Sequence, residues 1–374
     1  MNKKNQELSV VRGIALWAVV GIHTFSMGTT NIEVGETGYF LYKIIHTLLQ
    51  FAVPCFIFLA SILLSYNLGD KKQKLVGFYK KKGMRILVPY FVWTFIYVIP
   101  KMFKGWIPFD SLWSKDSWLY WFLWGKGHDH LYFMSVMVQI CIVAPLFIFG
   151  IRLIMRYAKK YSTPIIITGA VVGQVVLYLI YKRYIYSWIH SSATLMISYF
   201  LLIVMGIYIG FNYDNFIKWL EKRKSIVIIG TMISASIYIV LVYRMANQIQ
   251  ISTTFYQMNW YVYTFLVSML LVLIARKIQD KKFTKYISWI GTYSFGIYLI
   301  HPIQTFFLKQ HVTTSNPVLL MIIILVSQAL IILSCGFLTK MIQSNRLTAW
   351  VVGEKIKENR HDNEVIKVER SSLG

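Results

Sequence analysis

The chain has 374 residues, of which 56% are hydrophobic and only 14% are charged. Soluble domains carry about a quarter charged residues, so this composition excludes a water-soluble multidomain protein. The three cysteines lie far apart in the sequence, which excludes a disulfide-rich scaffold. A net charge of +24 can indicate a nucleic-acid partner, so the distribution of Lys and Arg along the chain matters.

Long apolar windows recur along the whole chain, and charge is confined to the short segments between them. A membrane-spanning helix needs about 20 mostly apolar residues. We therefore expect an all-α, polytopic membrane helical bundle of about ten transmembrane helices. The aromatic segment 112–124 is too short to cross and is expected to lie at the membrane interface. The ten windows are residues 9–27, 42–66, 86–103, 131–155, 164–182, 194–211, 225–244, 259–275, 286–308 and 317–341.

Lysine and arginine predict the orientation, because short cytoplasmic loops collect them. With the amino terminus in the cytoplasm, 30 of the 39 Lys and Arg fall on the cytoplasmic side. Both termini are therefore expected there, and the net charge reflects membrane topology without any nucleic acid. This assignment divides the chain into a transmembrane domain, residues 1–345, and a polar cytoplasmic tail, residues 346–374. The first window lacks a signal-peptide cleavage site and is expected to stay as an anchor.

Ionisable groups inside a membrane are costly and therefore mark candidate functional sites. Arg12 and His23 share the first window. Their spacing of just over three helical turns lets both side chains project from one face, about 16 Å apart along the axis. Taken singly, Arg12 is equally explained as a topology charge that reaches lipid phosphates, and His23 as a hydrogen-bonded packing residue.

Lys82 and Arg85 form a second candidate site at the cytoplasmic entry of the third window. At i and i+3 they share one side of an expected helix start. Free amide groups and two cations there are suited to binding phosphate. The preference of cytoplasmic loops for positive charge explains the same residues more simply.

The ninth window carries a polar stripe of Ser294, Tyr298 and His301, spaced i, i+4 and i+7. Glycines in this window allow close approach of a neighbouring helix. Hydrogen bonds that only hold the bundle together explain the stripe equally well. His130 opens the fourth window, where an interfacial polar cap is the simpler explanation. Alternation of the windows brings His23, His130 and His301 to the outer half of the membrane.

Taken together and in this order, these pieces resemble the acyltransferase 3 family of integral membrane acyltransferases. Lys82 stands where the family pattern has an arginine, which keeps the charge but loses the planar fork that binds phosphate in two places. Tyr132 replaces a family tryptophan and keeps an amphipathic ring. The matching pieces are the Arg12 and His23 pair and the segments 78–89, 130–134 and 294–302.

The resemblance implies an O-acyltransferase that uses acyl-CoA as a co-substrate and holds no bound cofactor. The phosphates of CoA would meet Lys82 and Arg85, and His23 would act as general base or carry the acyl group itself. Arg12 would hold the donor or steady negative charge. The candidates for binding the acceptor or the oxyanion are Ser294, Tyr298, His301 and His130.

The implied acceptor is a hydroxyl of an extracytoplasmic polysaccharide or a lipid-linked glycan, and the acyl group is acetyl or succinyl. The implied location is the bacterial plasma membrane, as a multi-pass protein in contact with membrane lipids and with other polysaccharide-assembly proteins. Chain length and the segment 53–58 are most similar to the branch associated with secreted polysaccharides. That branch includes proteins of poly-N-acetylglucosamine adhesin, for which the resemblance implies either O-succinyl transfer or export.

Two other functions fit the same windows. A polysaccharide exporter is compatible with intramembrane histidines, although matching broken helices in two halves of the chain are not evident. A lipid-linked glycosyltransferase would want an outer-loop acid, for which Glu33 and Glu36 are the candidates. No ligand cluster has the spacing of a metal site, so we expect no metal.

Overall fold

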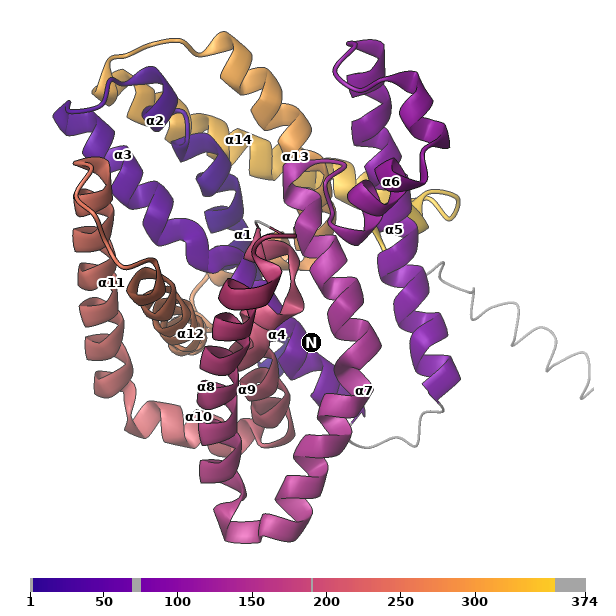
Figure 1. The fold of residues 1–374 in the computed structure, drawn as a ribbon, viewed down its shortest axis with the longest axis vertical. Helices are drawn as coiled ribbons and strands as arrows, with labels where there is room; N and C mark the ends of the chain where they lie inside the picture. The colour runs from indigo at the N-terminus through magenta and orange to yellow at the C-terminus, as the bar shows by residue number, and fades with distance from the viewer. Residues whose placement is uncertain (1–2, 69–74, 190, 354–374) are drawn as a thin grey trace, which may run out of the picture.

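The computed structural model describes residues 3–68, 75–189 and 191–353 (Figure 1). Every regular element in these ranges is a helix, so the expected all-α fold is confirmed. The longer helices are α1 (Lys3–Phe25), α3 (Thr37–Leu48), α4 (Ala52–Leu68), α5 (Leu75–Phe103), α7 (Tyr132–Ala158), α8 (Ser162–Ile180), α9 (Phe200–Phe211), α10 (Tyr213–Lys222), α11 (Lys224–Ala246), α12 (Thr253–Ile278), α13 (Thr284–His311) and α14 (Pro317–Ser344). The short helical turns are α2 (Gly28–Asn31), η1 (Leu49–Phe51), η2 (Phe109–Trp113), α6 (Lys115–Trp118), η3 (Leu119–Leu123), η4 (Asp129–Leu131), η5 (Lys159–Tyr161), η6 (Tyr181–Ile185), η7 (Ser192–Thr194), η8 (Met196–Tyr199) and η9 (Ala349–Val352).

The protein is a multi-pass membrane protein. Seven segments of the described chain are long and apolar enough to cross a membrane, or up to eight with α9 and α10, which bend by 107°. One of these segments, residues 129–185, contains both α7 and α8, which fold back on each other at η5 (Figure 1). α13 is not among the seven, because its serine, threonine and histidine side chains lower its hydropathy. The count of ten crossings and the cytoplasmic position of both termini stay predictions.

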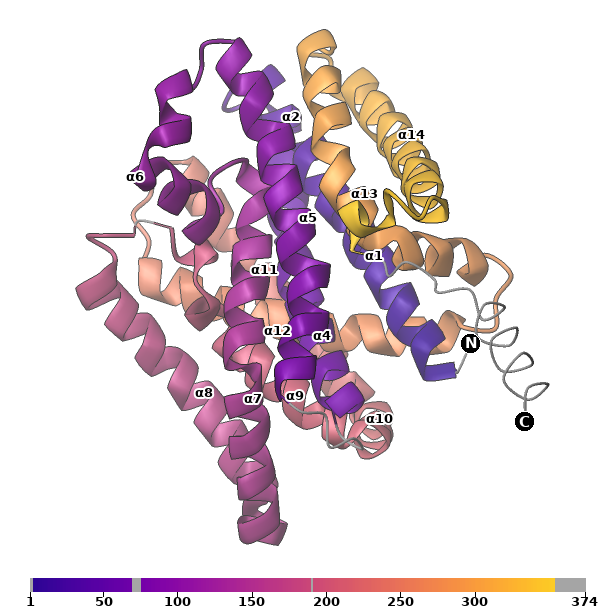
Figure 2. The ribbon, with the colours of Figure 1, turned by 90° about the vertical axis from the view of Figure 1, so that its right-hand side faces the viewer.

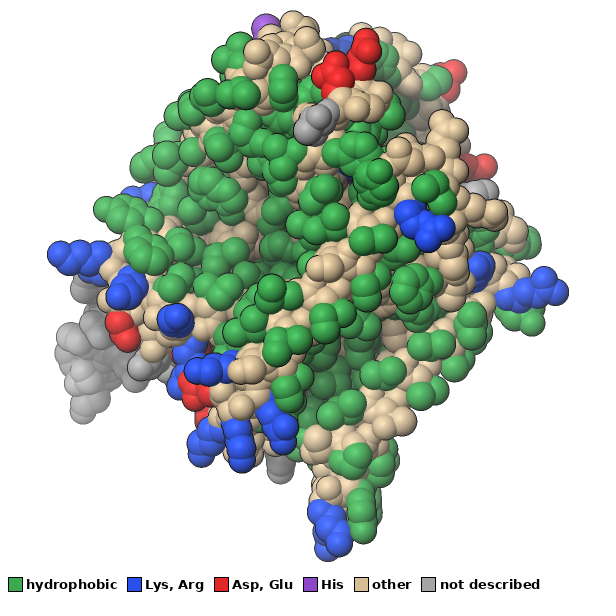
Figure 3. Space-filling view, turned by 90° about the vertical axis from the view of Figure 1, so that its left-hand side faces the viewer, with side chains coloured by type: hydrophobic (Ala, Val, Ile, Leu, Met, Phe, Trp, Pro, Cys, Tyr) green, Lys and Arg blue, Asp and Glu red, His purple; other side chains and the backbone are tan. Residues whose placement is uncertain are grey.

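Charge and apolar surface are separated on the outside of the bundle. Figure 3 shows apolar side chains across the middle of one face, most Lys and Arg in its lower half, and acidic side chains both near the top and among the basic ones below. Long apolar side chains such as Met232 on α11 and Leu330 on α14 are exposed. A water-soluble protein rarely exposes so continuous an apolar surface, and lipid tails are its natural surroundings.

The window 42–66 is broken in the structure. α3 ends at Leu48, one 3₁₀ turn follows, and α4 begins at Ala52. Pro54 explains the break, because proline lacks an N–H and its ring clashes with the carbonyl four residues earlier in a continuous helix. The break positions Gln50 and Pro54 beside a cavity described below.

The aromatic segment 112–124 forms only short turns, within η2, α6 and η3. Its Trp118 contacts Phe91 and Phe95 of α5, with ring centroids 6.2 Å and 5.5 Å away. No helix in this described segment is long enough to cross a membrane, as expected, while its place at the interface stays a prediction.

α1 and α13 run side by side in the same direction, at the centre of the fold. A Cβ added to Gly291 would lie 1.7 Å from the Ser9 carbonyl oxygen, and one added to Gly13 would lie 2.2 Å from the Ile287 carbonyl oxygen. Glycine at these two positions therefore lets the two backbones touch. α13 and α14 lie together on one side of the bundle, away from the α7 and α8 hairpin (Figure 2).

The chain beyond α14 turns back onto the bundle. The Trp93 indole N–H of α5 donates to the carbonyl of Val351 in η9 at 3.0 Å. Residues 354–374, the larger part of the expected cytoplasmic tail, lie outside the described residues. The domain boundary at residues 345 and 346 stays a prediction.

Candidate active site

Three histidines from different helices meet inside the bundle. The ring of His23 on α1 lies 5.2 Å from that of His301 on α13, and His301 lies 6.0 Å from His130 of η4. His130 and His301 are almost fully buried, and His23 is half-buried. The structure thus brings together the three histidines that the sequence analysis assigned to one half of the membrane.

Hydrogen bonds fix the tautomer of His301. Its Nδ1 lies 3.1 Å from the Ile297 carbonyl oxygen, and a carbonyl oxygen only accepts, so Nδ1 carries the hydrogen in the neutral ring. Nε2 then holds a lone pair. This Nε2 is buried and makes no hydrogen bond within the described residues, and the same is true of His130 Nε2.

Tyr298 holds His130 in place. The Tyr298 hydroxyl donates to the backbone carbonyl of His130, and the two rings lie 5.3 Å apart. The Tyr298 ring is also 5.9 Å from His301. Since the hydroxyl hydrogen is already used, Tyr298 acts here as a positioning residue for His130.

Two residues of this cluster were not found from the sequence. His128 Nδ1 lies 2.9 Å from His130 Nδ1, and Tyr97 on α5 contacts both rings, at 4.4 Å and 4.9 Å. His128 was visible as the first half of a His-x-His pair, whereas Tyr97 carried no signal within its apolar window. Burial first, and the nearby Lys101 second, lower the pKa of His128 to about 4.

Arg12 lines an inner cavity of about 170 Å³, with Ser294 and Tyr298 of α13 in the same wall. Its guanidinium donates to the Ser9 hydroxyl at 3.1 Å and forms no ion pair within the described residues. Apart from these groups the wall is apolar. The apolar side chains are Phe56, Leu59, Ala60, Leu63, Phe133 and Phe295.

An outer cavity of about 330 Å³ meets the same helices at neighbouring residues. Pro54 and Tyr132 line this outer cavity, whereas Phe56 and Phe133 line the inner one. The rings of Phe56 and Phe133 are in contact, with centroids 6.3 Å apart. Because the two cavities share α4 and α7 at neighbouring positions, we expect the Phe56 and Phe133 pair to lie between them.

Lys82 and Arg85 do not stand at a helix start, so that expectation is wrong. α5 begins at Leu75, because the basic segment before Ile86 consists largely of good helix formers and continues the helix. The amide groups of a helix terminus are therefore absent beside these cations. Neither side chain is among the residues that line the inner cavity.

Arg85 nevertheless lies close to the wall of that cavity. A Cβ on Gly353 would lie 2.8 Å from the Arg85 carbonyl oxygen and 2.9 Å from the ring of Phe295, which lines the cavity. Arg85 Nε is buried and makes no hydrogen bond within the described part of the chain. A buried donor without a partner is a candidate for contact with an anionic ligand.

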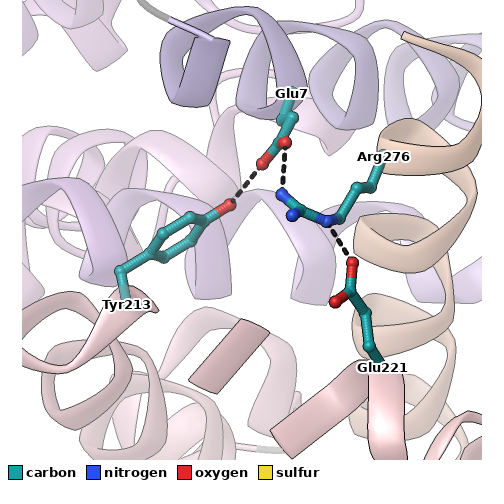
Figure 4. A network of polar contacts seen from close by, with 4 residues as sticks. All are labelled: Glu7, Tyr213, Glu221 and Arg276. Atoms are coloured by element: carbon teal, nitrogen blue, oxygen red, sulfur yellow. Dashed lines mark hydrogen bonds and ion pairs between the residues drawn. The ribbon is translucent and has the colours of Figure 1, made fainter. Parts of the chain in front are cut away.

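An ion-pair network holds the amino-terminal end of α1 (Figure 4). Glu7, which is 2% exposed, accepts from Arg276 of α12 at 2.9 Å and from the Tyr213 hydroxyl at 3.2 Å. Arg276 also pairs with Glu221 of α10, whose side chain is 50% exposed. Nothing in the sequence marks this network, because Glu7 lies just before the first apolar window.

Among the described residues, no group of three or more His, Cys, Asp or Glu is placed to hold a metal ion. All three cysteines are buried and free. The described side chains of the site offer imidazoles, the guanidinium groups of Arg12 and Arg85, and hydroxyl groups.

Comparison with known proteins gives two positive findings. Residues 5–337 match the model of the acyltransferase 3 family, described as an acyltransferase domain. Two proteins of Staphylococcus aureus, from strains MRSA252 and Mu50, are each named a probable poly-β-1,6-N-acetyl-D-glucosamine export protein. Each is 24% identical over 311 residues, which cover 81% of this chain and 83% of the relative. No solved structure matches.

Proposed function

Because this chain belongs to the acyltransferase 3 family, and is therefore a membrane acyltransferase, we propose that it moves an acetyl or succinyl group from acyl-CoA to a glycan hydroxyl. The acceptor is a polysaccharide or lipid-linked glycan outside the plasma membrane of a bacterium. The observation that carries the proposal is the placement of His23 and His301 in contact, on the two helices that also bring Arg12 to the inner cavity.

His23 acts as the general base in this proposal. It takes the proton of the acceptor hydroxyl while the oxygen attacks the thioester carbon. The carbon–sulfur bond then breaks, and the leaving thiolate of CoA takes the proton from His23, so that no net proton is released. A positioned base contributes about 10² to 10⁴ in rate. The lone pair on His301 Nε2 lies beside His23 and is suited to hold that ring or the acceptor hydroxyl by a hydrogen bond.

Arg12 acts on the donor at a distance from the reacting carbon. About 16 Å of helix separates it from His23, so one small group cannot touch both. The apolar wall of the inner cavity suits the pantetheine arm and acyl chain, and Arg12 and Arg85 suit the negative groups of the donor. Lys82, one turn from Arg85 on α5, adds positive charge at the same end.

Export is a second candidate, supported by the names of the two relatives from Staphylococcus aureus. The two functions differ in what they do to the polymer, because an exporter moves the glycan whereas an acyltransferase changes it. The same set of buried histidines is compatible with both functions, so an experiment on the polymer has to distinguish them.

The test is mass spectrometry of the surface polysaccharide in strains that carry the wild type, His23→Ala or His311→Ala. His311 lies exposed at the end of α13 and serves as the matched histidine control. We expect His23→Ala to leave the polymer on the surface without its ester, and His311→Ala to leave both. Loss of the surface polymer together with an unchanged ester ratio would instead support export.

A further inference from the structure

The outer cavity continues into a second one. A cavity of about 450 Å³ shares Ser192, Tyr256 and Gln257 with the outer cavity of about 330 Å³. Each volume falls in the range of ordinary ligand sites, roughly 300 to 1,000 Å³. We call the two together the outer groove. Its walls lie on η1 and the start of α4, at Tyr132 of α7, on α8 and η6, η7 and η8, at Met245 of α11, and on the first turns of α12. Its inner end includes Ile22, the residue before His23.

Aromatic rings dominate the walls of the outer groove. Several of them are fixed by hydrogen bonds, since the Tyr199 hydroxyl donates to the Ala193 carbonyl at 3.1 Å and the Tyr181 hydroxyl to the Ile189 carbonyl at 2.9 Å. Rigid amphipathic rings bind a ligand at little cost in conformational entropy. The seven aromatic wall residues are Tyr132, Tyr178, Tyr181, Tyr186, Tyr199, Tyr256 and Trp260.

Amide and hydroxyl groups stand between the rings. Gln50 and Gln257 line the groove with Ser192 and Ser198. Gln50 Oε1 accepts from the Tyr238 hydroxyl at 3.0 Å, which fixes the amide and leaves its nitrogen as the group that donates. Side chains of this kind both donate and accept, and so they match a ligand rich in hydroxyl and amide groups.

The described walls of the outer groove carry positive charge and no negative charge. Lys182 is the single charged residue among the described wall residues, which include no carboxylate. Its Nζ donates to the hydroxyls of Thr253 at 3.2 Å and Thr254 at 2.8 Å. A cationic sugar would meet a like charge here and find no opposite one, whereas a neutral sugar would lose nothing.

We propose that the outer groove binds several residues of a neutral, N-acylated sugar chain and leads one of its hydroxyls to His23. Rings stack on the apolar faces of the sugars, and amides and serines bond their hydroxyl and N-acyl groups. The proposal rests on the proposed function for the last step, the delivery to His23, but not for binding itself. Binding is therefore the property to measure.

The experiment uses the full-length protein with His23→Ala, which prevents turnover, in lipid nanodiscs. The probes are a short β-1,6-linked N-acetylglucosamine oligomer and its de-N-acetylated, cationic counterpart, each titrated by calorimetry. We expect the neutral oligomer to bind more tightly than the cationic one. Trp260→Ala is expected to weaken the neutral oligomer about tenfold, whereas Trp113→Ala, at an 88% exposed tryptophan on η2, changes nothing.

Lys182→Glu gives a second measurement at an exposed position of the groove wall. It is expected to raise the affinity for the cationic oligomer several-fold and to leave that for the neutral oligomer unchanged. Tighter binding of the cationic oligomer by the wild-type groove, or equal binding in Trp260→Ala and Trp113→Ala, overturns the proposal. Loss of sugar binding in Trp260→Ala while His23→Ala strains still carry the ester would overturn the proposed function and leave the groove standing.

Discussion

The two ends of α1 are built in different ways. The amino-terminal end is held by charge, through Glu7 and Arg276, and faces an apolar cavity with one guanidinium, that of Arg12. The other end is held by ring contacts between His23 and His301 and borders a groove of tyrosines and amides. One rigid helix thus carries a cation beside an apolar cavity and, near its other end, an imidazole next to Ile22 in the wall of a more polar one. The proposed function would place the thioester donor at the first end and the sugar acceptor at the second.

The largest expected effect concerns the charge that holds the amino-terminal end. Arg276→Ala removes the arginine that pairs with the buried carboxylate of Glu7, and losing a hydrogen bond to a charged group of this kind costs up to about 3 kcal/mol of unfolding free energy. The measurement is denaturation of the purified protein in detergent. Glu221→Ala is the matched control, because it removes the exposed partner of the same arginine and is expected to cost less than about 1 kcal/mol. Equal losses in the two variants would show that burial of Glu7 does not matter.

Arg12 tests whether the inner cavity serves the donor alone. Arg12→Ala is expected to raise the KM for acyl-CoA roughly 10- to 100-fold, because charge-assisted hydrogen bonds contribute about 1.5 to 3 kcal/mol. The KM for the sugar oligomer should stay the same, and Arg12→Lys should recover part of the loss. Steady-state kinetics in proteoliposomes measures all three, and an equal rise in both KM values would contradict the division between the two cavities.

The Phe56 and Phe133 contact tests whether the cavities are kept apart. Phe133→Leu removes one of the two rings in this contact but keeps an apolar side chain of similar volume. We expect acyl-CoA hydrolysis in the absence of acceptor to rise several-fold, because water reaches the thioester more easily. Release of free CoA is the measurement, and Phe265→Leu, in an aromatic pair elsewhere on α4 and α12, is the control. An unchanged rate of hydrolysis would place the barrier elsewhere.

The sequence predicts those parts of the site where a single residue is energetically costly in its surroundings, such as an ionisable side chain in an apolar window. His23 and His301 stand out because few ionisable groups occur in the apolar windows, and helix periodicity with alternating direction is enough to send them to the same half of the membrane. Glu7 and Arg276 are 269 residues apart, and nothing in either local pattern selects the other. Their pairing follows only from the way α1, α10 and α12 pack.

The same distinction explains the other misses. The windows located the apolar helices, but the start of α5 at Leu75 depends on the helix propensity of a basic segment that hydropathy treats as a loop. Tyr97 is one of 25 tyrosines, and only the approach of η4 to α5 singles it out. The outer groove is assembled from residues 22, 50–54, 132, 178–199 and 245–260, so its aromatic character is invisible until these five parts of the chain are packed.

The smallest expected effect concerns pH at the imidazole end. Burial keeps His128 neutral in the folded protein, with a pKa of about 4, whereas in the unfolded chain it takes up a proton below about pH 6.5. Its contribution to stability is therefore complete above pH 6.5 and is lost as the pH falls toward 4. His128 faces Lys101 and Tyr97 on α5 and Asp129 beside it.

His128→Gln, which stays neutral, should make the melting temperature roughly 2 °C less sensitive to the change from pH 7 to pH 5. Since Lys101 lowers the pKa of His128 in the folded protein, Lys101→Met should raise that pKa, so that the loss of stability becomes smaller and ends at a higher pH. An identical pH profile for wild type and His128→Gln would mean that His128 is open to solvent, and that the ring contacts at this end of α1 are looser than the ion pairs at the other.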